Sequence, residues 1–152
     1  METNRKSAVA AGVLFILATV ADVMSRVAFL TPVLGLPDPL AAVAANETSV
    51  VLGALLLVVG AAAAAGIAIA MYPVMRGHGE ALALGSVGFR LIEGTFYLGI
   101  VVCLLILVAM GEEAVSSGSP VAFAVPATLV LAAREALGQV GVLAFALSLI
   151  HI

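Results

Sequence analysis

Long apolar runs alternate with short polar segments along this chain of 152 residues. Four apolar stretches stand out, at about residues 8–30, 49–72, 81–110 and 121–150. A helix needs roughly 20 apolar residues to cross the hydrocarbon core of a bilayer, and each stretch is long enough. Strands of a membrane barrel would alternate polar and apolar residues, which runs such as AAAAAGIAIA do not. The pattern predicts an all-α bundle with four spanning helices, in a single transmembrane domain over residues 1–152.

The polar segments between the stretches carry residues that end helices. TPVLGLPDPL (31–40) contains three prolines and a glycine, YPVMRGHGE (72–80) contains a proline and two glycines, and GEEAVSSGSP (111–120) is a polar turn. Asp38, directly before a proline, predicts an N-cap for a short surface helix over Leu40 to Ala45. The third stretch is longer than a membrane requires, so it is either tilted or split.

Charged residues outside the stretches predict the orientation. The basic residues Arg5, Lys6 and Arg76 lie before the first stretch or between the second and third, whereas the other two loops carry only acids. Because positive loops stay on the cytoplasmic side, we expect a plasma-membrane protein with both termini in the cytoplasm. The alternative for the first stretch is a cleavable signal peptide that ends near Ala21. It is disfavoured because the apolar run continues to Leu30.

The composition agrees with a lipid environment. Hydrophobic residues make up 64% of the chain and charged residues 10%, whereas soluble domains have about 45–50% and about 25%. The lipid bilayer is therefore the first partner that we expect, and a homo-oligomer or another membrane protein is compatible with the pattern. The net charge of -3, without a basic stripe, argues against nucleic acid. Cys103 is the single cysteine, so no disulfide can form within the chain and no thiol pair can bind a metal. No other motif predicts a metal or a cofactor.

Charges inside the apolar stretches are the candidate site. They are Asp22, Arg26, Arg90, Glu93, Arg134 and Glu135. An unpaired charge at the centre of a spanning helix costs roughly 2.5–3.5 kcal/mol. The first four form two pairs at spacings of four and three residues, so each pair shares a helix face. The last two are adjacent and point about 100° apart, so each needs a partner on another helix.

We expect these charges, with Gln139, to form one buried network that links the first, third and fourth stretches. Arg90 and Glu93 should face the bundle interior, toward the first and fourth stretches, and Arg134 or Glu135 should contact this pair. The network is either an ionic lattice that fixes helix packing or a polar pocket that handles protons or ions. A simpler alternative for the arginines of the first and third stretches is that they reach toward the nearer membrane interface.

Small residues predict where helices come close. Ala62, Gly66 and Ala70 recur at a spacing of four residues and form a ridge suited to helix contact. The glycines at positions 85, 88, 138 and 141 lie beside the charges of the third and fourth stretches. They should allow the backbones to approach there or leave room for a cavity.

Three segments resemble a known family. ANETSVVLGALL (45–56), LALGSVGFRLIEG (82–94) and LVLAAREALGQVG (129–141) are similar to the DUF4386 family, a domain of unknown function in small multi-pass bacterial membrane proteins. The likeness covers nearly the whole chain, from NRKSAVAAGVLFILATVA (4–21) onward. The resemblance implies a helical bundle whose members continue with further spans, and it carries over no catalytic residue.

The last six residues, LSLIHI (147–152), are the peptide encoded by a transposon-end adapter that is used in shotgun sequencing libraries. We expect the natural sequence to stop near Ala146. The chain would then be a C-terminally truncated family member, and His151 would have no function.

These observations predict an integral membrane protein without enzymatic activity, which acts by interaction or regulation. The alternative is a small proton-linked transporter or permease subunit that uses Glu93 or Glu135 as its proton-binding carboxylate. An intramembrane enzyme is disfavoured because the sequence contains no reactive constellation. Substrate and partner are not encoded in any motif of this sequence.

Overall fold

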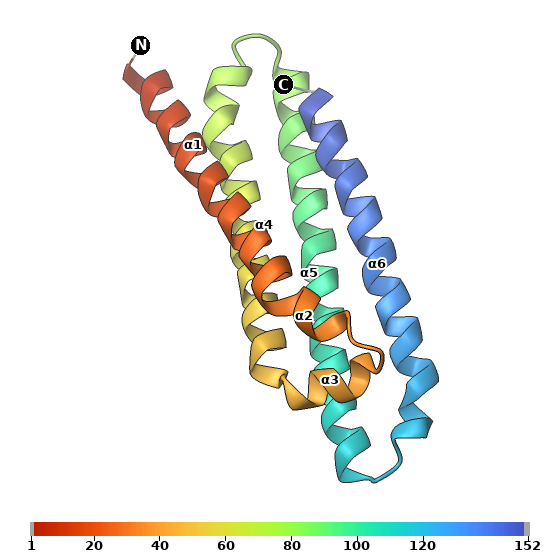
Figure 1. Cartoon of the computed structure of the whole chain (residues 1–152). Coiled ribbons are helices and arrows are strands. Elements are labelled where there is room, and N and C mark those ends of the chain that lie inside the picture. The colour runs from red at the N-terminus through yellow and green to blue at the C-terminus, as the bar shows by residue number, and fades with distance from the viewer. Residues whose placement is uncertain (1, 151–152) are drawn as a thin grey trace.

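The computed structural model describes residues 2–150, in which every regular element is a helix (Figure 1). The elements are α1 (Glu2–Val23), the π-helix η1 (Met24–Leu30), α2 (Thr31–Leu34), α3 (Pro39–Ala45), α4 (Glu47–Met75), α5 (Glu80–Ser116) and α6 (Pro120–Ile150). The expectation for His151 lies outside the described residues.

Four helices are long and apolar enough to cross a membrane. They cover Arg5–Leu34, which joins α1, η1 and α2, and then Glu47–Met75, Glu80–Ser116 and Pro120–Ile150. At a rise of 1.5 Å per residue the shortest is about 43 Å long, more than the hydrocarbon core of about 30 Å. This confirms the predicted all-α membrane fold with four spans. The third span is a single unbroken helix of 37 residues, so the alternative of a split is wrong.

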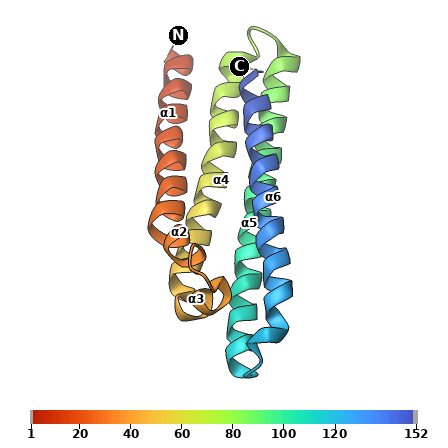
Figure 2. The same cartoon turned by 45° about the vertical axis from the view of Figure 1, so that its right-hand side comes forward.

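The long helices form an open row, which Figures 1 and 2 show from two sides. Each packs against the next in chain order: α1 on α4, α4 on α5, and α5 on α6. The outer helices α1 and α6 bury much less of their apolar surface than α4 and α5 do. The hydrophobic core accordingly lies along α4 and α5 and includes Val50, Leu57, Leu104 and Leu107.

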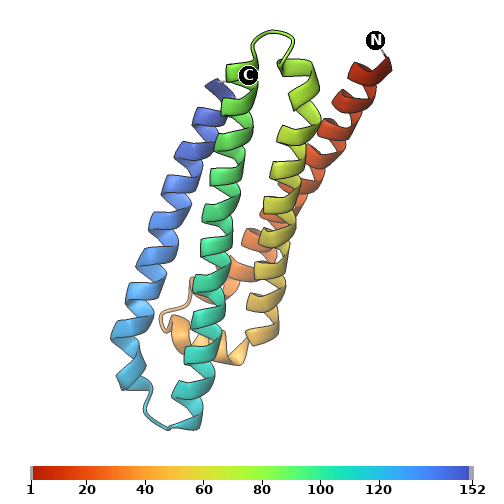
Figure 3. The same ribbon diagram turned by 180° about the vertical axis from the view of Figure 1, so that it is seen from behind.

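The two ends of the row differ in charge. The start of α1, the end of α6 and the α4–α5 turn lie at one end, whereas α3 and the α5–α6 turn lie at the other (Figures 1 and 3). Arg5, Lys6 and Arg76 therefore share the first end. The acids of the other two loops share the second. The basic residues and the acids of these two loops, which alternate along the chain, are thus separated at opposite ends of the structure.

The short helix α3 closes the second end. As predicted, Asp38 is its N-cap: the carboxylate Oδ1 accepts a hydrogen bond from the Ala41 N–H at 3.1 Å. One face of α3, with Ala41 and Ala45, is exposed, whereas Val43 on the other face is fully buried because α3 packs on α5. A Cβ built on Gly111 would lie only 3.2 Å from the backbone nitrogen of Ala44. The apolar face of α3 is covered because glycine lets α5 approach it.

A second close approach joins η1 to α4. The Ser25 hydroxyl is fully buried and donates a hydrogen bond of 2.7 Å to the Gly53 carbonyl. A Cβ on Gly53 would lie 2.8 Å from the Leu30 side chain. The predicted small-residue ridge is confirmed only in part: Gly66 lies against Leu14 of α1, but Ala62 is exposed.

Candidate functional site

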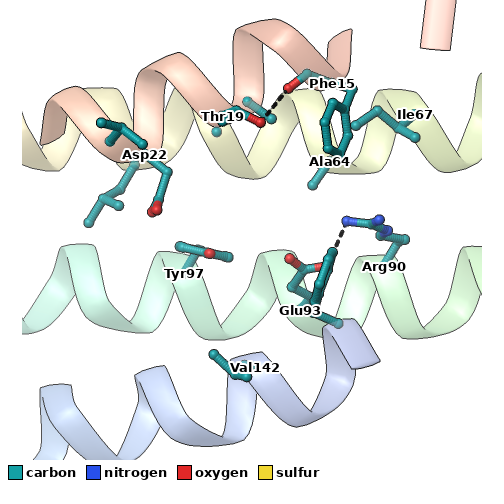
Figure 4. Close-up of a pocket in the computed structure, with 15 residues that line it drawn as sticks. Phe15, Thr19, Asp22, Ala64, Ile67, Arg90, Glu93, Tyr97 and Val142 are labelled. Carbon is teal, nitrogen blue, oxygen red and sulfur yellow. Dashed lines mark hydrogen bonds and ion pairs between the residues drawn. The ribbon is translucent and has the colours of Figure 1, made fainter. Parts of the chain in front are cut away.

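All four long helices line one cavity of about 250 Å³ in the middle of the row (Figure 4). Most of the wall is apolar. The polar side chains in it are Thr19 and Asp22 from α1 and Arg90, Glu93 and Tyr97 from α5. The Thr19 hydroxyl is already bonded, because it donates to the Phe15 carbonyl at 2.9 Å. The remaining charges and the phenol are therefore the groups that can meet a ligand.

Arg90 and Glu93 form the most buried ion pair of the described residues. The distance from Arg90 Nη1 to Glu93 Oε2 is 3.2 Å, and the two side chains are 8% and 6% exposed. The guanidinium also lies over the Phe145 ring of α6, at 4.7 Å from its centroid. Figure 4 shows both side chains on the cavity side of α5. This confirms the prediction that the pair faces the bundle interior.

Asp22 and Tyr97 extend the polar lining from α5 to α1. Both carboxylate oxygens of Asp22 accept from Arg26 Nε at 2.9 Å, one turn further along the helix. Tyr97 lies between Asp22 and Glu93 in Figure 4 and lines the same cavity as they do. The sequence prediction did not include Tyr97. Its spacing of four residues from Glu93 is the signal that could have identified it.

The remaining predicted residues line a second cavity of about 270 Å³. Arg26, Arg134, Glu135 and Gln139 contribute its polar atoms. Arg134 Nε is buried without a hydrogen-bond partner among the described residues, whereas Glu135 and Gln139 are exposed. The candidate residues therefore divide into two groups, joined through the Asp22–Arg26 pair.

The predicted contact of Arg134 or Glu135 with the Arg90–Glu93 pair is wrong. Among residues 2–150, no ion pair within 4.0 Å joins the two sets. The reason is the register of α6 on α5, because Gly138 lies beside Ile100. Measured along the helix axis from the contact of Gly138 with Ile100, Glu93 lies about 10 Å toward the end of the row that carries the basic residues. Arg134 lies about 6 Å from the same contact in the opposite direction.

Glycine contributes to this register, but not at every predicted position. A Cβ built on Gly141 would lie 3.4 Å from the Cβ of Phe96, and a Cβ built on Gly138 would lie 3.9 Å from the Cδ1 of Ile100. Both therefore let α6 approach α5, as expected. A Cβ built on Gly88 would have no neighbour within 4 Å, so of the two predicted roles Gly88 does not serve close helix approach and instead borders open space.

The described residues contain no group of three histidine, cysteine, aspartate or glutamate side chains that could hold a metal ion. Cys103 is buried and unpaired within the same part of the chain. What the site offers is two carboxylates, one guanidinium and a phenol around one cavity, which suits hydrogen bonding to a small polar molecule or exchange of a proton.

Comparison with known proteins connects this fold to a family. Residues 10–152 match the family model described as "Domain of unknown function (DUF4386)", which covers nearly the whole chain. No curated protein and no solved structure matches the chain.

Proposed function

We propose that this chain, which belongs to the DUF4386 family, is a small proton-linked transporter or permease subunit of the plasma membrane. Four of its helices are long and apolar enough to cross a bilayer, so the chain is an integral membrane protein. The proposal assigns it no enzymatic chemistry, and its ligand is a small polar solute held in the cavity between the four helices.

The proposal rests on one observation: each of the two ion pairs inside the apolar stretches forms within a single helix. Asp22 pairs with Arg26 on the helix formed by α1 and η1, and Arg90 pairs with Glu93 on α5. An ionic lattice that fixes helix packing would need pairs between helices, and neither of these pairs supplies one. Both acids instead line the shared cavity. Charges inside spanning helices that form no ion pair between helices are best explained by a ligand or a proton that they serve.

Glu93 is the residue to which we assign the proton. While its carboxylate is charged, it holds the Arg90 guanidinium at 3.2 Å. When Glu93 takes up a proton, this attraction is lost and the guanidinium can donate to a ligand in the cavity. Proton binding and ligand binding then strengthen or weaken each other by the same factor, as thermodynamic linkage requires.

For the orientation, we propose that the N-terminus lies in the cytoplasm. The basic residues gather at one end of the row and the acids of two loops at the other. Positive charges near the ends of spanning helices favour the cytoplasmic side. The cavity would then be reached from the cytoplasm along α1 and α4, whose polar ends lie on that side.

The test is the variant Glu93→Gln in proteoliposomes. The protein is reconstituted around a trapped pH-sensitive dye, and proton uptake is followed under an imposed pH gradient with a panel of amino acids, amines and sugars outside. We expect at least one solute to drive proton uptake by the wild type and the Gln variant to lose this uptake while it still folds. The control is Glu112→Gln, which removes an exposed carboxylate at the far end of α5.

The second candidate is a role in interaction or regulation, with the Arg90–Glu93 pair serving only stability. Burial of this pair favours it, because a buried charge that loses its partner destabilises a protein by about 3–5 kcal/mol. Glu93→Gln would then lower the folded yield. Replacing both residues by leucine would restore the yield, because an apolar pair of similar volume leaves no buried charge. A wild type that takes up no protons with any solute, together with this rescue, would contradict the transport proposal.

A further inference from the structure

The second cavity, of about 270 Å³, holds polar groups that the proposed function does not use. They come from η1 and α6 and are Arg26, Arg134, Glu135 and Gln139. The rest of the wall is apolar or glycine and consists of Leu30, Leu57, Ile100, Gly138 and Val142. A mostly apolar cavity with a few convergent polar groups is typical of a site for a small ligand.

Two opposite charges in this cavity lack partners. Arg134 and Glu135 take part in no ion pair within 4.0 Å and in no hydrogen bond in the described part of the chain, and Arg134 Nε is buried. They cannot easily pair with each other, because adjacent side chains point about 100° apart around a helix. Charges inside a spanning helix are costly unless they are paired. Each of the two therefore requires an opposite charge from outside its own helix.

We infer that the second cavity binds an apolar amino acid as its zwitterion. The carboxylate of the ligand accepts hydrogen bonds from the guanidiniums of Arg26 and Arg134, whose planar forks match its two oxygens. Arg26 can take part because its hydrogen bonds to Asp22 come from Nε, so its Nη nitrogens can donate to the ligand. The ammonium group of the ligand donates to Glu135, and its side chain lies against the apolar part of the wall.

A zwitterion fits this cavity better than other ligands do. It satisfies Arg134 and Glu135 together and leaves the total charge unchanged, whereas Glu135 would repel a simple anion and the guanidiniums would repel a simple cation. A lipid headgroup can also carry opposite charges, but it lies at the membrane interface. Glu135 is the middle residue of the 31-residue α6, about 20 Å from either end of that helix. The depth of the cavity therefore favours a free solute.

A groove of about 400 Å³ gives such a solute a way in. Arg134 and Glu135 line both the cavity and this groove. The other residues of the groove belong to α2 and to the part of α6 nearer its start, and they are Leu34, Thr128, Leu131 and Ala132. The groove thus leads from the cavity toward the end of the row that carries the acidic loops. The inference concerns binding alone and does not rest on the proposed transport function.

Binding of radiolabelled L-leucine to the full chain in phosphatidylcholine nanodiscs tests the ligand class. We expect saturable binding that unlabelled L-leucine displaces. Isocaproate lacks the ammonium group and isoamylamine lacks the carboxylate, so each should displace the label at least about tenfold less well. No saturable binding of L-leucine or of the smaller L-alanine would overturn the inference, as would equal displacement by isocaproate. Loss of binding when phosphatidylethanolamine replaces phosphatidylcholine would identify a headgroup as the occupant and would also overturn it.

Variants of the full chain test the assigned contacts. Arg134→Leu should abolish binding of L-leucine and still fold, because no described residue loses a partner, and its unfolding temperature without ligand checks this. The control Arg76→Leu removes an exposed arginine after α4 and should bind as the wild type does. A folded Arg134→Leu variant that binds L-leucine normally would contradict the inference.

Glu135→Gln separates a binding role from a structural one. It should weaken binding of L-leucine about tenfold or more, because the ammonium group loses its charged partner. It should at the same time strengthen binding of isocaproate, because the repulsion between two carboxylates is removed. A change in the same direction for both ligands would contradict the assigned contact.

Discussion

Within the membrane, a charged side chain of this protein finds a partner when sequence spacing places one on the same helix face. Asp22 with Arg26 and Arg90 with Glu93 satisfy this rule at spacings of four and three residues. The pairs differ in burial: Asp22 and Arg26 are 31% and 46% exposed, whereas Arg90 and Glu93 are nearly covered. Loss of one partner should therefore destabilise the protein far more on α5 than on α1.

Ser25 allows a prediction at the residue scale, because its buried hydroxyl holds η1 to α4 through the Gly53 carbonyl. Ser25→Ala should lower the free energy of unfolding by about 0.5–1.5 kcal/mol. Thermal unfolding in detergent measures this, with Thr19→Ala as the control. The Thr19 hydroxyl bonds within its own helix and is exposed, so its loss should change the unfolding temperature little. Equal effects of the two substitutions would contradict the assignment.

At the scale of elements, η1 is where the first span departs from an ordinary α-helix. The Thr31 N–H donates to the Arg26 carbonyl, five residues earlier, which is the bond of a π-helix. Pro32 follows directly and has no N–H for the carbonyl of residue 28, so the α pattern is interrupted there. The wider turn lies beside Gly53 and carries the arginine that lines the second cavity.

Two glycines give a paired prediction about helix packing. Gly53→Ala should destabilise the protein by about 1–3 kcal/mol, because the new Cβ would lie 2.8 Å from Leu30. Gly88→Ala should instead stabilise it by up to about 1 kcal/mol, because open space surrounds Gly88 and alanine is the better helix former. Thermal unfolding of the two variants in the same detergent measures both. Effects of the same sign would contradict the described approach of η1 to α4.

At the scale of the whole molecule, the open row determines what is exposed. A closed bundle of four helices would bury the inner face of α1 and α6 against each other, whereas this arrangement leaves both as edges. The central cavity follows from that arrangement, because it lies along the middle of the row and all four long helices line it.

The orientation is a prediction at this scale. In a Cys103→Ala background, a membrane-impermeant maleimide added to intact cells should label Ser117→Cys in the α5–α6 turn. It should label His78→Cys in the α4–α5 turn only after the membrane is opened, because the basic end lies in the cytoplasm. An N-terminal epitope tag should behave like the second site. Labelling of His78→Cys from outside would reverse the proposed topology.

The sequence by itself determined the number of spans, their order and the asymmetry of the loops. Each of these depends on residues close together in the chain: apolar runs long enough for a bilayer, prolines and glycines that end helices, and an Asp38 that caps α3. The ion pairs could be predicted for the same reason, since three or four residues along a helix fix which side chains are neighbours.

Only the tertiary structure decided which charges share a cavity. Arg134 and Glu135 were expected beside Arg90 and Glu93, yet the register of α6 on α5 places them about 16 Å apart along the helix axis. That register is set by contacts such as Gly138 with Ile100, and by an α5 that runs on to Ser116, well beyond its apolar stretch. Hydropathy measures transfer into lipid for each segment alone. Hydropathy does not describe the axial position of one helix relative to the helix beside it.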